Sequence, residues 1–186
     1  MKDIILIGPQ GSGKGTQGKM LAEKFGFKIF ETGGELRKLA AEDSALGRKI
    51  KEITTRGDLV SNEIVMEIVE NFLENLEKNS AVIFDGIPRS VEQFESLKKL
   101  LDAKNREYFA IEVSVPEKET FARLKRRAEI EHRADDNEAA IKKRLENFRK
   151  FTAPILGKLR EEEKLVSVDG VGTVDEIFER VLRAAF

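Results

Sequence analysis

A glycine-rich stretch near the amino terminus carries a lysine at the spacing used for binding phosphates. It reads Gly8-Pro9-Gln10-Gly11-Ser12-Gly13-Lys14-Gly15-Thr16 and directly follows the apolar run at 4–7. Glycines let such a loop curl so that backbone N–H groups point inward, and a helix that begins there adds partial positive charge. Lys14 supplies a point charge for the outer phosphates of a nucleotide. The pattern predicts a phosphate-binding loop, in preference to a simple glycine-rich connection.

Further residues along the chain could hold a second phosphate group and a metal ion. Arg37 and Arg89 have planar guanidinium groups that suit bidentate contacts to phosphate. Asp85 follows the apolar run at 81–84, and ligands bind at the carboxyl ends of strands in open α/β sheets. A carboxylate there can hold Mg²⁺ directly or through water, and the Thr16 hydroxyl is a second possible ligand.

The composition excludes several other classes of site. The 186 residues include no cysteine, which rules out zinc–thiolate sites, disulfides and cysteine nucleophiles. His132 is the only histidine, and we expect it to be exposed and non-catalytic. The 33 basic and 34 acidic residues give a formal charge of −1, which argues against a nucleic-acid partner. No apolar run approaches the roughly 20 residues that span a bilayer, and no targeting segment is evident. We therefore expect no membrane partner and a cytoplasmic location.

Short apolar runs alternate with longer amphipathic stretches. The runs predict strands at 4–7, 28–30, 81–84, 108–115 and 165–168. Apolar residues at helical spacing predict helices at 16–25, 62–77, 90–101, 117–130, 137–159 and 174–185. Capping boxes are expected at Thr32 with Glu35, at Ser90 with Gln93 and at Thr173 with Glu176. This alternation predicts an α/β sandwich of three layers around a central parallel sheet of about five strands.

Two segments fit this alternation poorly. Residues 31–60 predict two short helices without a strand, and residues 126–136 form a charged interruption between two long helices. No repeat, low-complexity tract or Pro/Gly-rich linker divides the chain. We therefore expect one domain over residues 1–186, with insertions at 31–60 and 126–136.

From the glycine-rich loop onward the sequence resembles the adenylate kinases and their nucleoside-monophosphate kinase relatives. The usual phosphate loop has Ser or Thr directly after the lysine, whereas here the order Gly-Lys-Gly-Thr is the form seen in that family. The segment Glu31-Thr32-Gly33-Gly34-Glu35-Leu36-Arg37 is similar to the family's Ser-Thr-Gly-Asp-x-Leu-Arg, with departures at Glu31 and Gly34. Asp85-Gly86-Ile87-Pro88-Arg89, followed by Gln93, resembles Asp-Gly-Phe-Pro-Arg…Gln.

Two more segments extend the resemblance over nearly the whole chain. Gly57-Asp58-Leu59-Val60 is similar to the family segment whose backbone lines an adenine pocket. Arg123 and Arg127 lie four residues apart, so they share a helix face, and the stretch that follows resembles the family's short lid, Arg-x-Asp-Asp and a further arginine. The resemblance implies a P-loop NTPase-type fold, with a monophosphate-binding insertion at 31–60 and a short lid at 126–136.

The resemblance also implies a role for each matching residue. It implies catalytic roles for Lys14, Asp85, Arg89, Arg133 and Arg144. It implies ATP contacts by Gly11, Ser12, Gly13, Lys14, Gly15, Thr16, Arg123, Arg127 and Gly172. It implies AMP contacts by Thr32, Gly33, Arg37, Asp58, Leu59, Val60, Gly86, Ile87, Pro88, Arg89, Gln93, Arg133 and Arg144. Asp135 and Asp136 would form the lid hinge, and Asp85 and Thr16 would face Mg²⁺.

The activity that the resemblance implies is reversible, Mg²⁺-dependent transfer of the ATP γ-phosphoryl group to AMP, which yields two ADP. Mg²⁺ is then the cofactor, and zinc is not expected. Three alternatives stay open at this point. The chain could be a kinase for UMP or CMP, a P-loop hydrolase or nucleotide switch without an acceptor, or a nucleotide-binding protein without catalysis.

Overall fold

The computed structural model describes residues 2–131 and 137–186, and a parallel sheet lies at the centre of the fold. Five strands form it in the order β2-β3-β1-β4-β5. They are β1 (Asp3–Ile7), β2 (Lys28–Glu31), β3 (Val82–Asp85), β4 (Tyr108–Ser114) and β5 (Leu165–Asp169). The predicted α/β class and all five predicted strands are confirmed.

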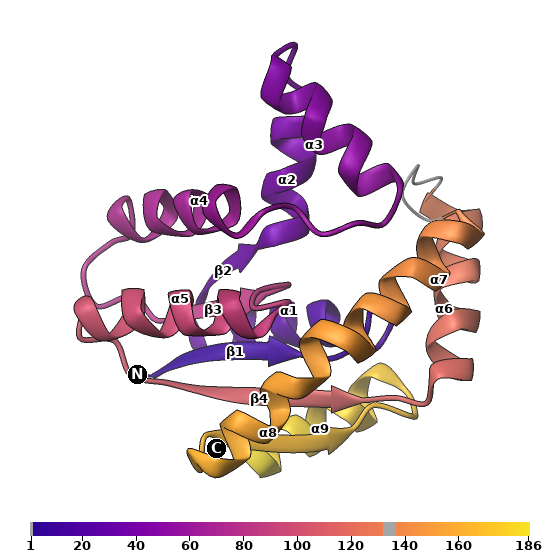
Figure 1. Cartoon of the computed structure of the whole chain (residues 1–186). Coiled ribbons are helices and arrows are strands. Elements are labelled where there is room, and N and C mark those ends of the chain that lie inside the picture. Colours follow the sequence, from indigo (N-terminus) through magenta and orange to yellow (C-terminus); the bar gives the residue numbers. More distant parts are fainter. Residues whose placement is uncertain (1, 132–136) are drawn as a thin grey trace.

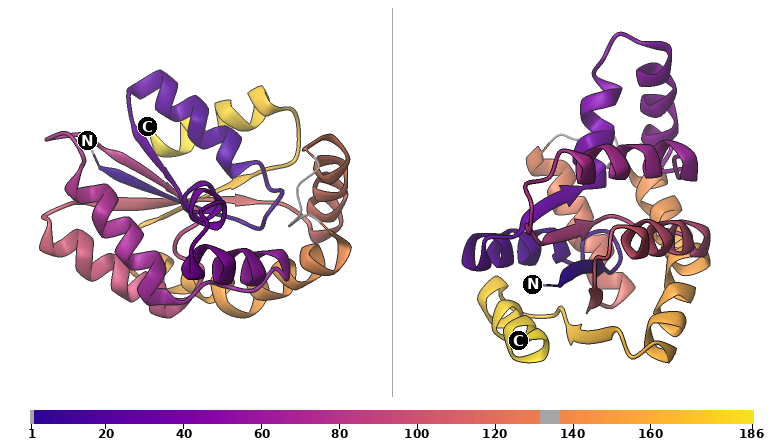
Figure 2. Two further views of the ribbon diagram at one scale, coloured as in Figure 1. Left: turned by 90° about the horizontal axis from the view of Figure 1, so that it is seen from above. Right: turned by 90° about the vertical axis from the view of Figure 1, so that its left-hand side faces the viewer.

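Helices cover both faces of this sheet (Figures 1 and 2). One face packs against α1 (Lys14–Phe25) and α9 (Val174–Ala185), and the other packs against α4 (Asn62–Glu74), α5 (Val91–Ala103) and α8 (Ala153–Glu161). No helix within 2–131 or 137–186 is long and apolar enough to cross a membrane.

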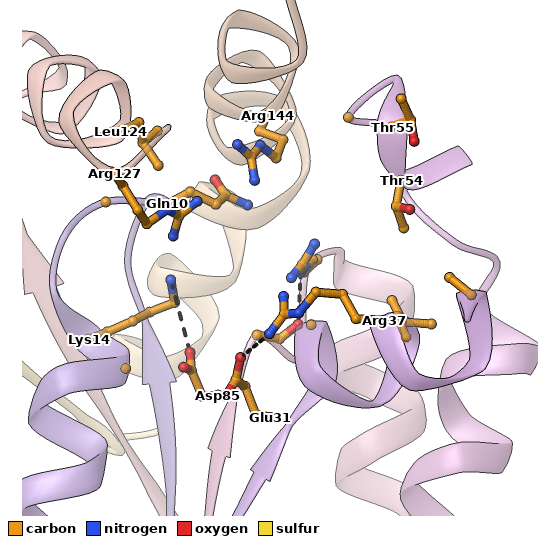
Figure 3. Close-up of a pocket in the computed structure, with 18 of the residues that line it drawn as sticks. Gln10, Lys14, Glu31, Arg37, Thr54, Thr55, Asp85, Leu124, Arg127 and Arg144 are labelled. Carbon is orange, nitrogen blue, oxygen red and sulfur yellow. Dashed lines mark hydrogen bonds and ion pairs between the residues drawn. The ribbon is translucent and has the colours of Figure 1, made fainter. Parts of the chain in front are cut away.

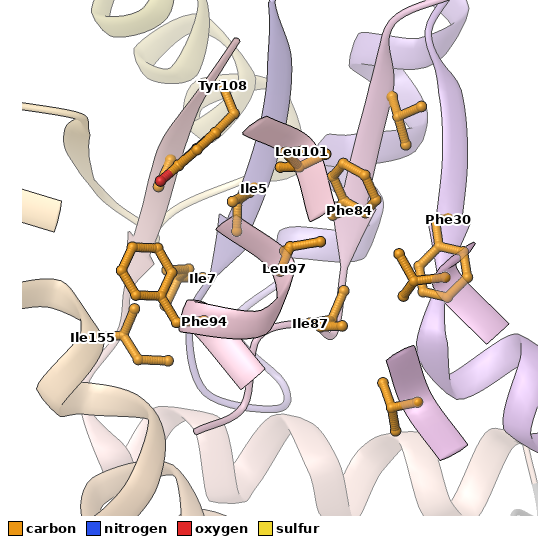
Figure 4. Close-up of a cluster of buried hydrophobic side chains, with 14 of the residues drawn as sticks. Ile5, Ile7, Phe30, Phe84, Ile87, Phe94, Leu97, Leu101, Tyr108 and Ile155 are labelled. Carbon is orange, nitrogen blue, oxygen red and sulfur yellow. The ribbon is translucent and has the colours of Figure 1, made fainter. Parts of the chain in front are cut away.

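The apolar runs are continuous because each strand has two buried faces. Along β1, Ile4 and Leu6 belong to the cluster that holds Leu21 of α1, whereas Ile5 and Ile7 belong to the cluster under α5 (Figure 4). Successive side chains of a strand point to opposite faces, so a strand between two helical layers needs apolar residues at every position. Each fully buried side chain of this size contributes about 1.5–3 kcal/mol.

The helices α2 (Thr32–Ala40) and α3 (Ala45–Thr55) project beyond the sheet (Figure 1). Ser44 caps α3, since its Oγ accepts a hydrogen bond from the backbone N–H of Gly47 at 2.9 Å. A Cβ at Gly47 would lie 2.6 Å from the carbonyl oxygen of Leu39, so the two helices approach at a contact that only glycine fits. The two short helices predicted without a strand are present, whereas the division of the chain into insertions stays a prediction.

The helix predicted at 137–159 is present, since the chain stays helical from Glu138 to Glu161, but it is not a uniform α-helix. The chain forms α7 (Glu138–Asn147), a wider π-helical turn η2 (Phe148–Thr152) and then α8. Pro154 stands in the first turn of α8, where it has no N–H to donate and its ring displaces the carbonyl four residues earlier. The hydroxyl of Thr152 donates to the carbonyl of Arg89 at 2.8 Å, which ties the turn to the segment after β3.

The three predicted capping boxes have different outcomes. At Thr173 the box is complete, with both reciprocal hydrogen bonds to Glu176. At Ser90 the hydroxyl accepts from the N–H of Gln93, but the Gln93 side chain accepts from the N–H of Arg89 instead. At Thr32 the prediction is wrong, because α2 begins at Thr32 itself and its hydroxyl, buried from water, makes no hydrogen bond within the described residues.

A buried ion pair joins three strands at the amino-terminal edge of the sheet. Asp3 is 2% exposed, and Arg106 binds its carboxylate through two hydrogen bonds of 2.6 Å. The same carboxylate accepts from the backbone N–H of Val82, and Arg106 donates to the carbonyl of Ser80 at 2.8 Å. The pair therefore fixes the starts of β1 and β3 beside the turn before β4.

We predict that Asp3→Ala lowers the free energy of unfolding by about 2–3 kcal/mol, because it leaves a largely buried guanidinium without its carboxylate. Urea denaturation followed by circular dichroism measures the change. Glu107→Ala is the matched control at the same edge, since its pair with Lys2 is exposed on both sides. The control substitution should lower the free energy of unfolding by less than about 0.5 kcal/mol. Equal losses in the two variants would contradict the prediction.

Candidate active site

A cleft of about 770 Å³ opens where the carboxyl ends of β1, β2 and β3 meet the helices α2, α6 (Glu117–Glu131) and α7. It gathers residues far apart in the sequence (Figure 3). The predicted site residues that line it are Gly11, Gly13, Lys14, Gly15, Thr16, Gly33, Arg37, Asp58, Asp85, Gly86, Arg89, Arg123, Arg127 and Arg144.

The loop between β1 and α1 has the backbone that phosphate binding requires. Gly11 and Gly13 have φ values of +83° and +90°, which side-chain-bearing residues rarely adopt. A Cβ at Gly11 would also lie 2.9 Å from the carbonyl oxygen of Thr120. Gly13 is the N-cap of α1, so the amino end of that helix opens directly onto the cleft. An anion placed there meets backbone N–H groups and the positive end of the helix dipole.

Lys14 and Asp85 face each other on the floor of the cleft. The Nζ of Lys14 lies 4.0 Å from Oδ1 of Asp85, and both side chains are 15% exposed. Burial lowers the pKa of Lys14; Asp85 opposes this shift, whereas the positive charges of Arg89, Arg127 and Arg144 add to it. A bound phosphate chain would relieve this crowding of positive charge.

The order Lys14-Gly15 has a steric cause. A Cβ at Gly15 would lie 2.8 Å from Oδ2 of Asp85. The serine or threonine that usually follows the lysine would therefore displace the carboxylate that Lys14 faces, and the hydroxyl is found one position later, at Thr16.

Two arginines lie on the side of the cleft opposite the phosphate loop. Arg37 of α2 donates from Nη2 to Oε1 of Glu31 at 2.8 Å. Arg89 donates from Nε to the carbonyl of Gly86 at 2.8 Å. Gly86 has a φ of +84°, so the chain turns sharply after β3 and carries Arg89 back over the cleft. Figure 3 shows Arg37 reaching toward Glu31 from one side and Lys14 toward Asp85 from the other.

A narrow recess of about 20 Å³ adjoins this second side and shares lining residues with the cleft. Its walls include the remaining residues predicted for the acceptor base, namely Thr32, Leu59, Val60 and Gln93. Thr32 lines this recess, and its buried Oγ1 makes no hydrogen bond within the described residues.

The carboxyl-terminal half of the chain supplies the wall above the phosphate loop. Arg123 donates to Glu119, to the carbonyl of Ser12 at 3.3 Å and to the carbonyl of Gly170 at 3.1 Å. It therefore joins the phosphate loop to the segment after β5. Arg144 of α7 lines the cleft although its residue is only 8% exposed.

The helix α7 is also attached to the end of α3. Asn147 donates to the carbonyl of Gly57 at 3.0 Å, and Asn137 donates to the carbonyl of Thr55 at 3.3 Å. Gly57 has a φ of +75°, and a Cβ there would lie 2.7 Å from the carbonyl oxygen of Ala140. The backbones of the two segments thus meet at a glycine.

Comparison with known proteins agrees with this geometry. A family model described as adenylate kinase matches residues 6–164. The adenylate kinase of Thermus thermophilus is 42% identical over 183 residues, which cover 98% of this chain and 95% of the relative. The adenylate kinases of Phocaeicola vulgatus and Bacteroides thetaiotaomicron are 38% and 36% identical over 185 residues, 99% of this chain and 98% of each relative.

The chain belongs to the adenylate kinase family.

Some residues predicted from the resemblance to adenylate kinases lie outside the cleft. Ser12 is fully buried, and Ile87 belongs to the hydrophobic core below α5. Pro88 is also buried, and Gly172 lies beside Glu176 and Arg180 near the start of α9. The predictions for Arg133, Asp135 and Asp136, and the expectation for His132, fall outside the residues that the structure describes.

Other cleft residues were not predicted. Glu31, Gln10 and Lys19 line it, as do Lys51, Thr54 and Thr55 near the end of α3. Oε1 of Gln10 is buried and accepts no hydrogen bond from the described residues. Its place within the phosphate loop was a usable signal, because an amide side chain at the tip of that loop faces the same ligand as the lysine.

The oxygen donors of the cleft suit a magnesium ion carried by a nucleotide. Within the described ranges, no three His, Asp or Glu side chains gather into a group that could enclose a metal ion. Asp85 at the end of β3 and Thr16 in the first turn of α1 offer a carboxylate and a hydroxyl at the cleft. So small a set fits Mg²⁺, which keeps several waters and is held largely by substrate phosphates.

We predict that Gly15→Ala destabilises the fold by about 1 kcal/mol, because the added methyl group displaces Asp85. The same change in an Asp85→Ala background should stabilise by up to about 1 kcal/mol, since alanine is the better helix former. Gly157→Ala in α8, where a Cβ meets nothing within 4 Å, is the control and should also stabilise. Urea unfolding of the four variants tests this, and a cost at Gly15 that is independent of Asp85 would refute it.

Proposed function

We propose that this chain catalyses reversible transfer of the γ-phosphoryl group of ATP to AMP, with Mg²⁺ as cofactor, and thereby forms two ADP. The observation that carries the proposal is the single cleft in which a phosphate loop with Lys14 faces two arginines, Arg37 and Arg89, across Asp85. Such an arrangement suits two phosphate-bearing substrates that meet end to end.

Phosphoryl transfer asks for positioning and for neutralisation of charge, with no covalent chemistry by the protein. Lys14 and the backbone N–H groups of its loop would hold the donor phosphates, and Arg37 and Arg89 the acceptor phosphate. Arg123, Arg127 and Arg144 line the donor side and would meet charge that develops during transfer. Bound Mg²⁺ would neutralise charge on the donor phosphates, with Asp85 and Thr16 as the residues that face it.

The acceptor end would open before a base could enter. A recess of about 20 Å³ has room for little more than one water molecule, which needs about 10–15 Å³ of cavity volume, and a nucleotide base is far larger. The helices α2 and α3, which form the proposed monophosphate-binding insertion at 31–60, would therefore move on binding. Closure of this segment and of the proposed lid at 126–136 would exclude water, the competing acceptor.

The choice of AMP rests on the lining of that recess. Thr32 and Gln93 both line it, and hydroxyl and amide groups recognise a base through hydrogen bonds to its edge. A panel of AMP, UMP, CMP and GMP, with ATP and Mg²⁺ as donor and coupled detection of diphosphate, tests the choice. AMP should give the highest kcat/KM. A higher kcat/KM for UMP or CMP would show that this nucleotide, and not AMP, is the acceptor.

The same panel separates a kinase from the two remaining alternatives. A P-loop hydrolase or switch would consume ATP at the same rate with and without a monophosphate. A nucleotide-binding protein without catalysis would bind ATP and consume none. The arginines on the acceptor side favour a kinase over both, because neither alternative requires a second phosphate site.

We predict that Lys14→Met and Arg89→Met each lower kcat by about 100-fold or more, because each removes a charge aimed at the transferring group. Arg133, outside the described residues, is proposed to act in the same way. Lys24→Met, near the other end of α1 and outside the cleft, should keep kcat within about twofold. Steady-state assays with AMP measure all three, and near-normal turnover of either cleft variant would overturn the role given to that residue.

A further inference from the structure

Two carboxylates stand side by side at the carboxyl edge of the sheet, and each faces one cation. Glu31 ends β2 and Asp85 ends β3, and the parallel register makes these two residues direct partners. Asp85 faces Lys14 on the phosphate-loop side, and Glu31 faces Arg37 on the acceptor side (Figure 3). The function proposed above uses Asp85 but gives Glu31 no role.

The carboxylate of Glu31 lies where an anionic ligand would be expected. Glu31 is the N-cap residue of α2, yet its side chain makes no capping hydrogen bond. Its Oε1 instead accepts from Nη2 of Arg37 at 2.8 Å. A helix amino terminus with an arginine beside it attracts a phosphate group. Glu31 thus supplies the negative charge that a phosphate would otherwise bring.

Two glycines leave room for this pair. A Cβ at Gly33 would lie 3.1 Å from Nη1 of Arg37, so a side chain there would press on the guanidinium. A Cβ at Gly34 would lie 3.6 Å from Cδ of Glu31, in contact with the carboxyl group. Glu31 and Gly34 are also the two positions at which the segment departs from the family's Ser-Thr-Gly-Asp-x-Leu-Arg. Compared with that motif, the segment carries an acidic residue at position 31 instead of position 34.

We propose that Glu31 sets the affinity of the acceptor site, because it holds Arg37 as an internal substitute for phosphate and must yield it when the acceptor binds. The proposal rests on the proposed function, because it takes Arg37 as a ligand of the acceptor phosphate. Both side chains are partly exposed, at 41% and 47%, so the pair can exchange with a ligand from solution. The acceptor phosphate therefore binds against a competing negative charge.

Removal of that charge should tighten acceptor binding and leave donor binding unchanged. In Glu31→Gln, the KM for AMP should fall about two- to fivefold, the upper part of the range for one exposed ion pair. The KM for ATP should stay within about twofold. Glu31→Ser, which restores a good N-cap residue, should shift the KM for AMP in the same direction. The difference from the unaltered protein should shrink at high salt, because salt screens exposed charges.

Glu35→Gln is the matched control. Glu35 lies on the same helix and pairs with Lys38 at 2.7 Å, but it is not among the residues that line the cleft. This variant should leave both KM values within about twofold. An unchanged or higher KM for AMP in Glu31→Gln, or an equal fall in Glu35→Gln, would overturn the proposal.

Calorimetric titration with inorganic phosphate separates this proposal from the proposed function. It requires no transfer reaction, and because the phosphate loop is the same in both proteins, a difference between them reports on the anion site beside Arg37. Tighter phosphate binding by Glu31→Gln than by the unaltered protein supports competition by Glu31, even if the acceptor panel were to show no kinase activity. Equal binding by the two proteins rejects that competition, even if AMP proves to be the acceptor.

Discussion

Parallel pairing of β2, β3 and β1 is the constraint on which the site depends. The register aligns Leu6 with Asp85 and Asp85 with Glu31, so the three strands end together at one edge. The phosphate loop follows β1, α2 follows β2, and Arg89 follows β3. A shift of one residue in the β1–β3 pairing would turn Asp85 away from Lys14, since successive side chains of a strand point to opposite faces. The burial of both sheet faces prevents such a shift.

Positive charge is concentrated in this cleft at a cost to the fold. Lys14 is largely buried among arginines, and its lowered pKa reflects that cost. Asp85 offsets part of it, and the substrates' phosphates would offset more. The arrangement is typical of proteins that give up stability at a binding site and recover it when the ligand arrives. The buried Asp3–Arg106 pair at the opposite edge of the sheet differs, because its two charges neutralise each other without a ligand.

The sequence predicted the elements well because their signals are local. Continuous apolar runs located every strand, and the Gly-Lys-Gly-Thr order located the helix that carries the cleft's lysine. Prediction from the sequence failed where the structure depends on residues that are distant in the chain. Thr32 has the pattern of a cap, but α2 begins one residue earlier than that pattern implies, and its hydroxyl lies in the recess instead. Pro154 was a local signal for the π-helical turn between α7 and α8, yet the strong helical spacing on either side outweighed it.

The ion pair of Glu31 could not be predicted from the sequence, because it depends on how two elements meet. Its ion pair with Arg37 spans six residues and forms only because α2 turns Arg37 back over its own first turn. By contrast, the place of Asp85 at the carboxyl end of a strand was predictable, because it directly follows an apolar run. A side chain is predictable when its role follows from its own element, and it is not when the role belongs to a contact between elements.

The attachment of α7 to Thr55 and Gly57 has a thermodynamic consequence. Through these hydrogen bonds, a movement of the wall that carries Arg144 would be transmitted to the end of the α2–α3 segment. Free energy released if one nucleotide were enclosed would then contribute to ordering the segment that receives the second. By linkage the effect is mutual: the two ligands would bind with positive cooperativity, whichever arrives first.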